Sequence, residues 1–109
     1  MRTVKSILDE LQRELGIKEK VRVEIKPMKS KAASVSLRTG VIRLNKHAMD
    51  SGELCIKYLL LHELAHLKLG RTTHGDDFYR VVYSVMSPDE VEECERKLIQ
   101  SLKERLMKG

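Results

Sequence analysis

The sequence predicts one α+β domain over residues 1–109, with an N-terminal helix, a small three-stranded antiparallel sheet, a buried central helix and two C-terminal helices. Three observations support this fold class. Hydrophobic residues recur at helical spacing near both ends of the chain, short segments between residues 21 and 45 alternate between apolar and polar side chains, and a long apolar segment in the second half stops at a glycine. A chain of 109 residues can bury one hydrophobic core.

The first helix is predicted by an apolar stripe whose members share one helical face: Val4, Ile7, Leu8, Leu11 and Leu15. Thr3 is a suitable N-cap because its hydroxyl can accept a backbone hydrogen bond, and Gly16 is a suitable residue to end the helix.

Three strands are expected next. Residues 21–26 alternate between apolar and charged side chains and stop at Pro27, which is typical of a half-buried strand. Residues 33–37 also alternate, and residues 41–45 follow after a turn that contains Gly40. The last two segments therefore predict a hairpin, and we expect the whole sheet to be antiparallel.

Three helices are expected in the second half. The first opens with Asp50 and Glu53 at capping-box spacing and ends at Gly70. The second begins just after His74, and the third begins at Ser87, where a hydroxyl is followed by proline and two acidic residues. The third helix carries an apolar stripe that consists of Val91, Cys94, Leu98, Leu102 and Leu106.

Composition favours a cytoplasmic globular protein. Hydrophobic residues make up 41% of the chain and charged residues 34%. No apolar run is as long as a membrane span, and residues 1–10 mix charges where a signal peptide has an apolar block.

Positive charge is concentrated in the first half of the chain. Residues 1–52 carry 12 Lys and Arg against 6 Asp and Glu, a net +6, whereas residues 53–109 carry 9 against 10, a net −1. Nucleic-acid binding is one interpretation of this basic half. No aromatic residues interleave with the charges as a stacking platform would need, so we favour a solvated surface.

Cys55 and Cys94 are the only two cysteines and form no Cys-x-x-Cys motif. We expect both to be buried thiols on helices. A disulfide between them, or a role of Cys94 in masking a metal, is the alternative.

The central helix places ionisable residues where it should be buried. Apolar side chains cover almost its whole circumference, and Lys57 and Lys68 mark one narrow solvent strip. His62 and His66 lie well round from this strip, so they and Glu63 need partners inside the protein. A metal ion would satisfy them directly.

The spacing His-Glu-x-x-His is typical of zinc-dependent hydrolases. Residues four apart project from one helical face, so His62 and His66 can bind one Zn²⁺ ion, while Glu63 can act as general base on a metal-activated water. A hydrolytic zinc site has three protein ligands, and His74 is the expected third because it follows the chain reversal. His47 fits no such pattern and is expected at the surface.

Residues 33–83 also resemble a known family. The strand that ends at Asn45, the helix with the sequence HELAHLKLG and the motif from His74 to Phe78, His-Gly-x-x-Phe, resemble the minimal zincin core. This core is shared by SprT-like proteases, related predicted metal-dependent hydrolases and the small archaeal minigluzincins.

The resemblance implies a metallopeptidase with His62 and His66 as zinc ligands and Glu63 as base. In SprT-like proteins the histidine that matches His74 completes the zinc site. Minigluzincins of this length are kept latent by their own C-terminal segment, so latency through the last helix is also implied.

Departures from these families leave some roles open. The chain has no tryptophan and no downstream zinc-ribbon cysteines, so the DNA-repair role of full-length SprT-type enzymes is not implied. In the gluzincin pattern the third ligand is a glutamate from a later helix. The alternatives to His74 are therefore Glu90, Glu92, Glu93 and Glu95. Asp76 or Asp77 could orient a ligating histidine, and Tyr79 or Tyr83 could reach the developing oxyanion.

We therefore predict a zinc metalloendopeptidase that cleaves an extended protein or peptide substrate aligned on the second or third strand. One alternative is a zinc-dependent RNA hydrolase, which the basic half would suit, although the related ribosome-maturation endoribonucleases lack an equivalent of Glu63. The other alternative is a non-catalytic or latent metal-binding domain, with the C-terminal helix over the cleft.

Overall fold

The computed structural model describes the backbone of residues 3–108 and the side chains to residue 100, so the expected stripe positions Leu102 and Leu106 lie outside the described side chains. The described elements, in chain order, are α1 (Val4–Leu15), β1 (Arg22–Lys26), β2 (Ala33–Val35), β3 (Val41–Asn45), the 3₁₀ helix η1 (Lys46–Ser51), α2 (Glu53–Leu69), α3 (Asp76–Tyr83) and α4 (Pro88–Lys108). This order confirms the α+β class. The extent of the domain, residues 1–109, stays a prediction.

The sheet is mixed, which corrects the prediction of a purely antiparallel sheet. Its strand order is β1-β3-β2, with β2 antiparallel and β1 parallel to the central strand β3. The hairpin of β2 and β3 was therefore predicted correctly and the direction of β1 was wrong. Alternation in a sequence identifies the two faces of a strand, but not its neighbour or its direction.

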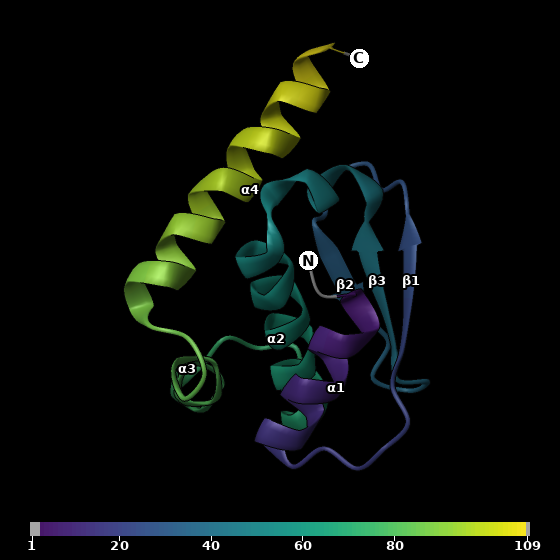
Figure 1. Ribbon diagram of the computed structural model, residues 1–109, viewed down its shortest axis with the longest axis vertical. Coiled ribbons are helices and arrows are strands. Elements are labelled where there is room, and N and C mark those ends of the chain that lie inside the picture. The colour runs from purple at the N-terminus through teal and green to yellow at the C-terminus, as the bar shows by residue number, and fades with distance from the viewer. Residues whose placement is uncertain (1–2, 109) are drawn as a thin grey trace.

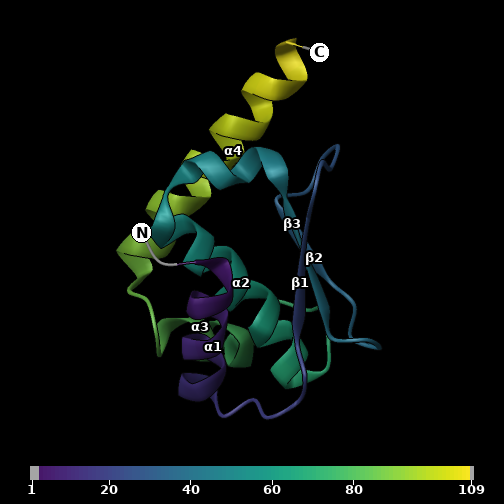
Figure 2. The same ribbon diagram turned by 45° about the vertical axis from the view of Figure 1, so that its right-hand side comes forward.

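The helices lie on one side of the sheet (Figures 1 and 2). α1 and α2 pack against each other, and α2 also contacts β2 and β3. α3 and the start of α4 lie on the far side of α2 from the strands, and α4 also contacts η1. Because α2 is enclosed by these elements, ten of its 17 residues are buried, as the sequence predicted for the central helix.

The start of α2 differs from the prediction. Asp50 belongs to η1 and does not cap α2; the N-cap is Gly52, which makes no side-chain hydrogen bond. The chain leaves η1 through Gly52 with φ of 99°, a conformation that L residues rarely adopt, so the helix begins only at Glu53. Its end at Gly70 is as predicted.

Cys55 and Cys94 form a disulfide that joins α2 to α4. Both residues are buried as expected, with 1% and 0% exposure, but the expectation of free thiols was wrong. Their Cα atoms are 5.2 Å apart, within the range that a disulfide spans. The sequence indicates the burial of each cysteine, whereas their pairing depends on how two distant helices cross.

Asn45 fixes the loop that leads into β2. Its side chain is fully buried and accepts hydrogen bonds from the backbone N–H groups of Met28 and His47. The same amide donates to the carbonyl oxygens of Met28 and Lys31, at 3.1 Å and 2.8 Å. This fully satisfied amide holds the backbone of Lys31 and of the residues that precede β2 beside the middle of α2.

Among the described residues, none of the helices is long and apolar enough to span a membrane. The cytoplasmic location stays a prediction.

Candidate metal centre

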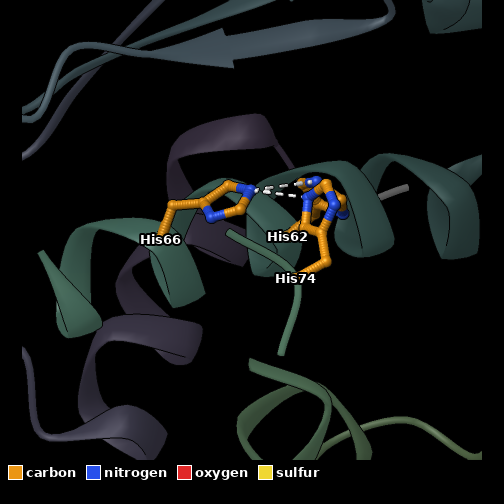
Figure 3. Close-up of side chains that lie close together, drawn as sticks. All are labelled: His62, His66 and His74. Carbon is orange, nitrogen blue, oxygen red and sulfur yellow. Dashed lines mark hydrogen bonds between the residues drawn. The ribbon is translucent and has the colours of Figure 1, made fainter. Parts of the chain in front are cut away.

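Three histidines converge on one point beside α2 (Figure 3). His62 and His66 come from successive turns of α2, and His74 comes from the segment between α2 and α3. The Nε2 atom of His66 lies 3.2 Å from Nε2 of His62 and 3.0 Å from Nε2 of His74. One ligand atom from each residue lies within 4.8 Å of the other two, so the structure brings together the three residues that the sequence nominated.

The end of α2 explains how His74 reaches the other two. Gly70 adopts the left-handed conformation with φ of 69°, and its N–H donates to the carbonyl of His66 at 2.8 Å. This glycine lets the chain reverse at the end of the helix without strain. Residues 71–75 then lead back past the last turn of α2, and His74 lies just before α3.

Two of the three nitrogen separations fit a zinc ion. Zinc binds imidazole at 2.0–2.1 Å in tetrahedral geometry, so two ligating nitrogens on one ion should lie about 3.3 Å apart. The nitrogens of His66 and its two neighbours are separated by 3.2 Å and 3.0 Å. A set of three imidazoles suits zinc among common metals, and three protein ligands leave one coordination position for a reactant.

The second ring nitrogens of His62 and His66 face polar groups, and the group beside His66 sets the tautomer of that residue. Nδ1 of His66 lies 3.1 Å from the carbonyl oxygen of Arg71, which can only accept, so Nδ1 carries the proton and Nε2 has a free lone pair. Nδ1 of His62 lies 3.4 Å from the hydroxyl of Tyr58. Such contacts orient metal-binding histidines and fix the nitrogen that binds.

Tyr58 and the carbonyl of Arg71 were missed by the sequence analysis, which proposed Asp76 or Asp77 for this role. Asp77 instead forms an ion pair with the guanidinium of Arg71 and accepts a hydrogen bond from the backbone N–H of Phe78 at 2.8 Å. Tyr58 precedes His62 by four residues, so helical spacing could have identified it.

Burial keeps His62 and His66 neutral. The pKa of His62 is lowered to about 4, mainly by desolvation and also by the neighbouring imidazoles of His66 and His74. Desolvation is also the main cause that lowers the pKa of His66. At neutral pH both side chains are therefore uncharged, with one ring nitrogen free to bind a metal.

Glu63 is a buried carboxyl group next to the histidines. It is 7% exposed, and its Oε2 atom lies 4.0 Å from Nε2 of His62. Burial raises the pKa of Glu63 to about 7, although the positive charge of Lys31 opposes the shift. A carboxyl group with a pKa near neutrality can accept and return a proton during catalysis.

The raised pKa of Glu63 makes the metal-free protein less stable as pH rises. Folding shifts this pKa from 4.5 to about 7. Below pH 4.5 the carboxyl group is protonated and does not lower the free energy of unfolding, whereas above pH 7 the buried carboxylate lowers it by the full amount. Relative to the unsubstituted protein, metal-free Glu63→Gln should gain about 2 kcal/mol of unfolding free energy from about pH 5 to about pH 8. Urea unfolding of both proteins after chelation of metal measures this difference at each pH. Both proteins contain the same histidines, so the effect of histidine titration cancels when the two unfolding free energies are subtracted. A difference that does not change with pH would contradict the shift.

Two cavities that adjoin at His62 and Glu63 make up a groove between α2 and β2. The first, of about 260 Å³, has mostly apolar walls and is lined by Lys31, Ala32, Ala33, Tyr58, Leu59, His62, Glu63, Glu95, Leu98 and Ile99. The second, of about 280 Å³, is lined by Lys31, Ala33, Ser34, Val35, His62, Glu63, His66, Thr72 and His74. Because the two cavities share Lys31, Ala33, His62 and Glu63, the candidate base and one candidate metal ligand lie where the two parts of the groove adjoin.

The rival glutamates differ in their positions. Glu95 lines the groove on the α4 side. Glu90 accepts a hydrogen bond from the backbone N–H of Ser87 in a capping box, and Glu93 pairs with Lys97. Of the four candidates, Glu95 is therefore the one that the described structure places in the groove.

Other candidates lie elsewhere or have another partner. His47 belongs to η1 and is partly buried rather than fully at the surface. Cys94 is in the disulfide, so it is not a free thiol that could mask a metal. Tyr79 and Tyr83 stack on each other with ring centroids 5.7 Å apart and are 40% and 44% exposed.

Comparisons with known proteins identify the family of the chain. A family model described as "YgjP-like, metallopeptidase domain" matches residues 1–101. An uncharacterized protein of Methanocaldococcus jannaschii, MJ0123, is 40% identical over 100 residues, which cover 91% of this chain and 91% of that protein. An uncharacterized protein of Aquifex aeolicus is 41% identical over 87 residues, which cover 79% of this chain and 78% of that protein.

Two crystal structures of metallopeptidase zymogens are similar over nearly their full length. Jannalysin of Methanocaldococcus jannaschii has a TM-score of 0.83 and 39% identity, and the match covers 94% of this chain and 99% of that one. Abylysin of Pyrococcus abyssi has a TM-score of 0.86 and 33% identity, and the match covers 93% of this chain and 96% of that one.

Proposed function

Because the chain belongs to the YgjP-like metallopeptidase family, we propose that it is a zinc endopeptidase in which His62, His66 and His74 bind the metal and Glu63 is the general base. The observation that carries this proposal is the convergence of the three Nε2 atoms next to a buried carboxyl group. The family favours a peptidase over an RNA hydrolase. The resemblance to archaeal minigluzincins is confirmed, since jannalysin and abylysin are minigluzincins.

Glu63 performs the proton transfers in this mechanism. A zinc ion, when bound, supplies Lewis acidity and lowers the pKa of a water molecule. Glu63 takes a proton from the attacking water and returns it to the amide nitrogen of the leaving group, so its carboxylate is regenerated. The Oε2 atom of Glu63 lies 4.0 Å from Nε2 of His62, so the carboxyl group is beside the proposed metal site, where both transfers would occur.

The substrate is a protein or peptide in extended conformation, and β2 is the strand that aligns it. β3 is central and pairs on both sides, whereas β2 is at an edge of the sheet. All three residues of β2, Ala33–Val35, line the groove. An extended peptide that pairs with this edge would pass in front of His62 and Glu63, and backbone hydrogen bonds would hold it.

We also propose that the intact chain is latent. The similar structures of jannalysin and abylysin are both described as zymogens. In this chain Glu95, Leu98 and Ile99 of α4 form one wall of the groove beside His62. Displacement of this part of α4 would widen the groove for substrate.

Metal analysis tests the proposed ligand set. The purified chain should bind one zinc ion, and His74→Ala should weaken binding by more than about 100-fold, since even residues that only orient ligands are worth 10- to 100-fold. Glu95→Gln, the matched substitution of the rival in the groove, should leave the dissociation constant within about threefold. Competition with a chromophoric chelator measures both. If Glu95→Gln weakens zinc binding and His74→Ala does not, Glu95 is the third ligand. If neither variant weakens zinc binding, neither residue is a ligand.

A further inference from the structure

Phe78 contacts all three imidazole rings of the candidate metal centre. It is the third residue of α3 and is 2% exposed. Its ring centroid lies 4.9 Å from that of His62 and 4.7 Å from those of His66 and His74. One side chain of α3 therefore contacts the candidate ligands of α2 and the one from the segment between α2 and α3.

The contacts differ in geometry, and together they restrict the rings in different directions. Phe78 stacks on His66 with an interplanar angle of 26° and meets His62 nearly at right angles, at 72°. It is tilted by 58° to His74. Stacked and edge-on contacts are the favourable arrangements of aromatic pairs, so rotation of any imidazole would lose contact with the phenyl ring.

His74 depends most on this contact. The ring nitrogens of His62 and His66 each face an anchoring group, Tyr58 and the Arg71 carbonyl respectively. His74 is exposed, and its described ring contacts are with the other two histidines and Phe78. Of these three contacting residues, Phe78 is the one that is not itself a candidate metal ligand.

We propose that Phe78 is a positioning residue that holds the three histidines in their convergent arrangement before metal binds, an inference that rests on the proposed ligand role of these histidines. A site whose ligands are already in place does not have to order them when the ion binds, so its affinity is higher. Asp77 supports the same arrangement, because its carboxylate accepts from the Phe78 N–H and pairs with Arg71, whose carbonyl faces His66.

A simpler role is that Phe78 only fills the hydrophobic core, to which it also belongs. The two roles differ in their consequences. A residue that only fills the core affects stability, and metal affinity should not depend on the flat ring. A positioning residue affects metal affinity even where an aliphatic side chain preserves the fold.

The test compares Phe78→Leu with Val82→Ala. Val82 is 1% exposed and lies one turn further along α3, so its truncation removes core packing on the same helix. Zinc dissociation constants are measured by chelator competition on metal-free protein, and thermal unfolding of the same samples measures stability. Phe78→Leu is expected to raise the dissociation constant 10- to 100-fold, the range typical for groups that orient metal ligands. Val82→Ala is expected to change it less than about threefold while it lowers the unfolding temperature.

A second variant, Phe78→Met, keeps the inference testable if Phe78→Leu does not fold, and the same rise is expected. Zinc affinity equal to that of the unsubstituted chain in either folded variant, or an equal loss in Val82→Ala, would overturn the inference. His62→Ala serves as the reference for the proposed function. If the unsubstituted chain and His62→Ala bind zinc equally, the proposed function fails; if only the Phe78 variants are unaffected, this inference alone fails.

Discussion

Glu63→Gln is expected to slow peptide cleavage by about 10²- to 10⁴-fold, the contribution usual for a general base, while zinc binding is retained. Gln keeps the size and polarity of the side chain but cannot accept a proton from water. The substitution should therefore remove proton transfer without removing a ligand. Cleavage of an unstructured protein substrate is measured at equal zinc occupancy, in any preparation in which the unsubstituted chain cleaves it.

The matched control is Glu93→Gln, the same chemical change at an exposed position of α4 that pairs with Lys97. This control should cleave at the unsubstituted rate, because an exposed ion pair at this spacing contributes little to stability. A Glu63→Gln protein that binds zinc and cleaves at the normal rate would show that another group acts as base.

Loss of the Cys55–Cys94 disulfide is expected to lower the free energy of unfolding by about 4 kcal/mol. The bond joins residues 39 positions apart in the sequence, and the chain-entropy model assigns this stabilisation to the restriction of the unfolded chain. The double substitution Cys55→Ala/Cys94→Ala removes the bond but keeps small apolar side chains at two buried positions. Chemical denaturation with and without a dithiol reductant measures the change.

The reductant provides the internal control. It should destabilise the unsubstituted protein by a similar amount and leave the double variant unchanged, since that variant has no thiols. Equal unfolding curves for the oxidised protein and the double variant would mean that the cross-link contributes nothing to stability.

Local signals made much of the fold predictable. Thr3 accepts a hydrogen bond from Ser6, Gly16 ends α1, and Ser87 and Glu90 form a capping box at the start of α4. Each depends on residues within a few positions of one another. The direction of β1 and the disulfide depend on contacts between distant segments, which a single sequence does not specify.

Some residues of the candidate site were also predictable from local spacing, and others were not. His62, Glu63 and His66 are related by helical spacing, so their common location could be derived from the sequence. Phe78 follows His74 by four residues, yet an aromatic residue at such a position usually indicates core packing rather than support for a ligand. The contribution of Arg71 is a backbone carbonyl, and no side-chain pattern marks it.

The bond between Cys55 and Cys94 also limits how the groove can open. It closes residues 55–94 into a covalent ring that contains Glu63 and the three histidines of the candidate metal centre, while Glu95 is the first residue beyond it. As long as the bond is intact, the start of α4 cannot leave α2, and any activating movement must swing the remainder of the helix about a fixed pivot. A thiol reductant would remove this pivot, so the oxidation state of two sulfur atoms decides whether α4 can turn in place or detach.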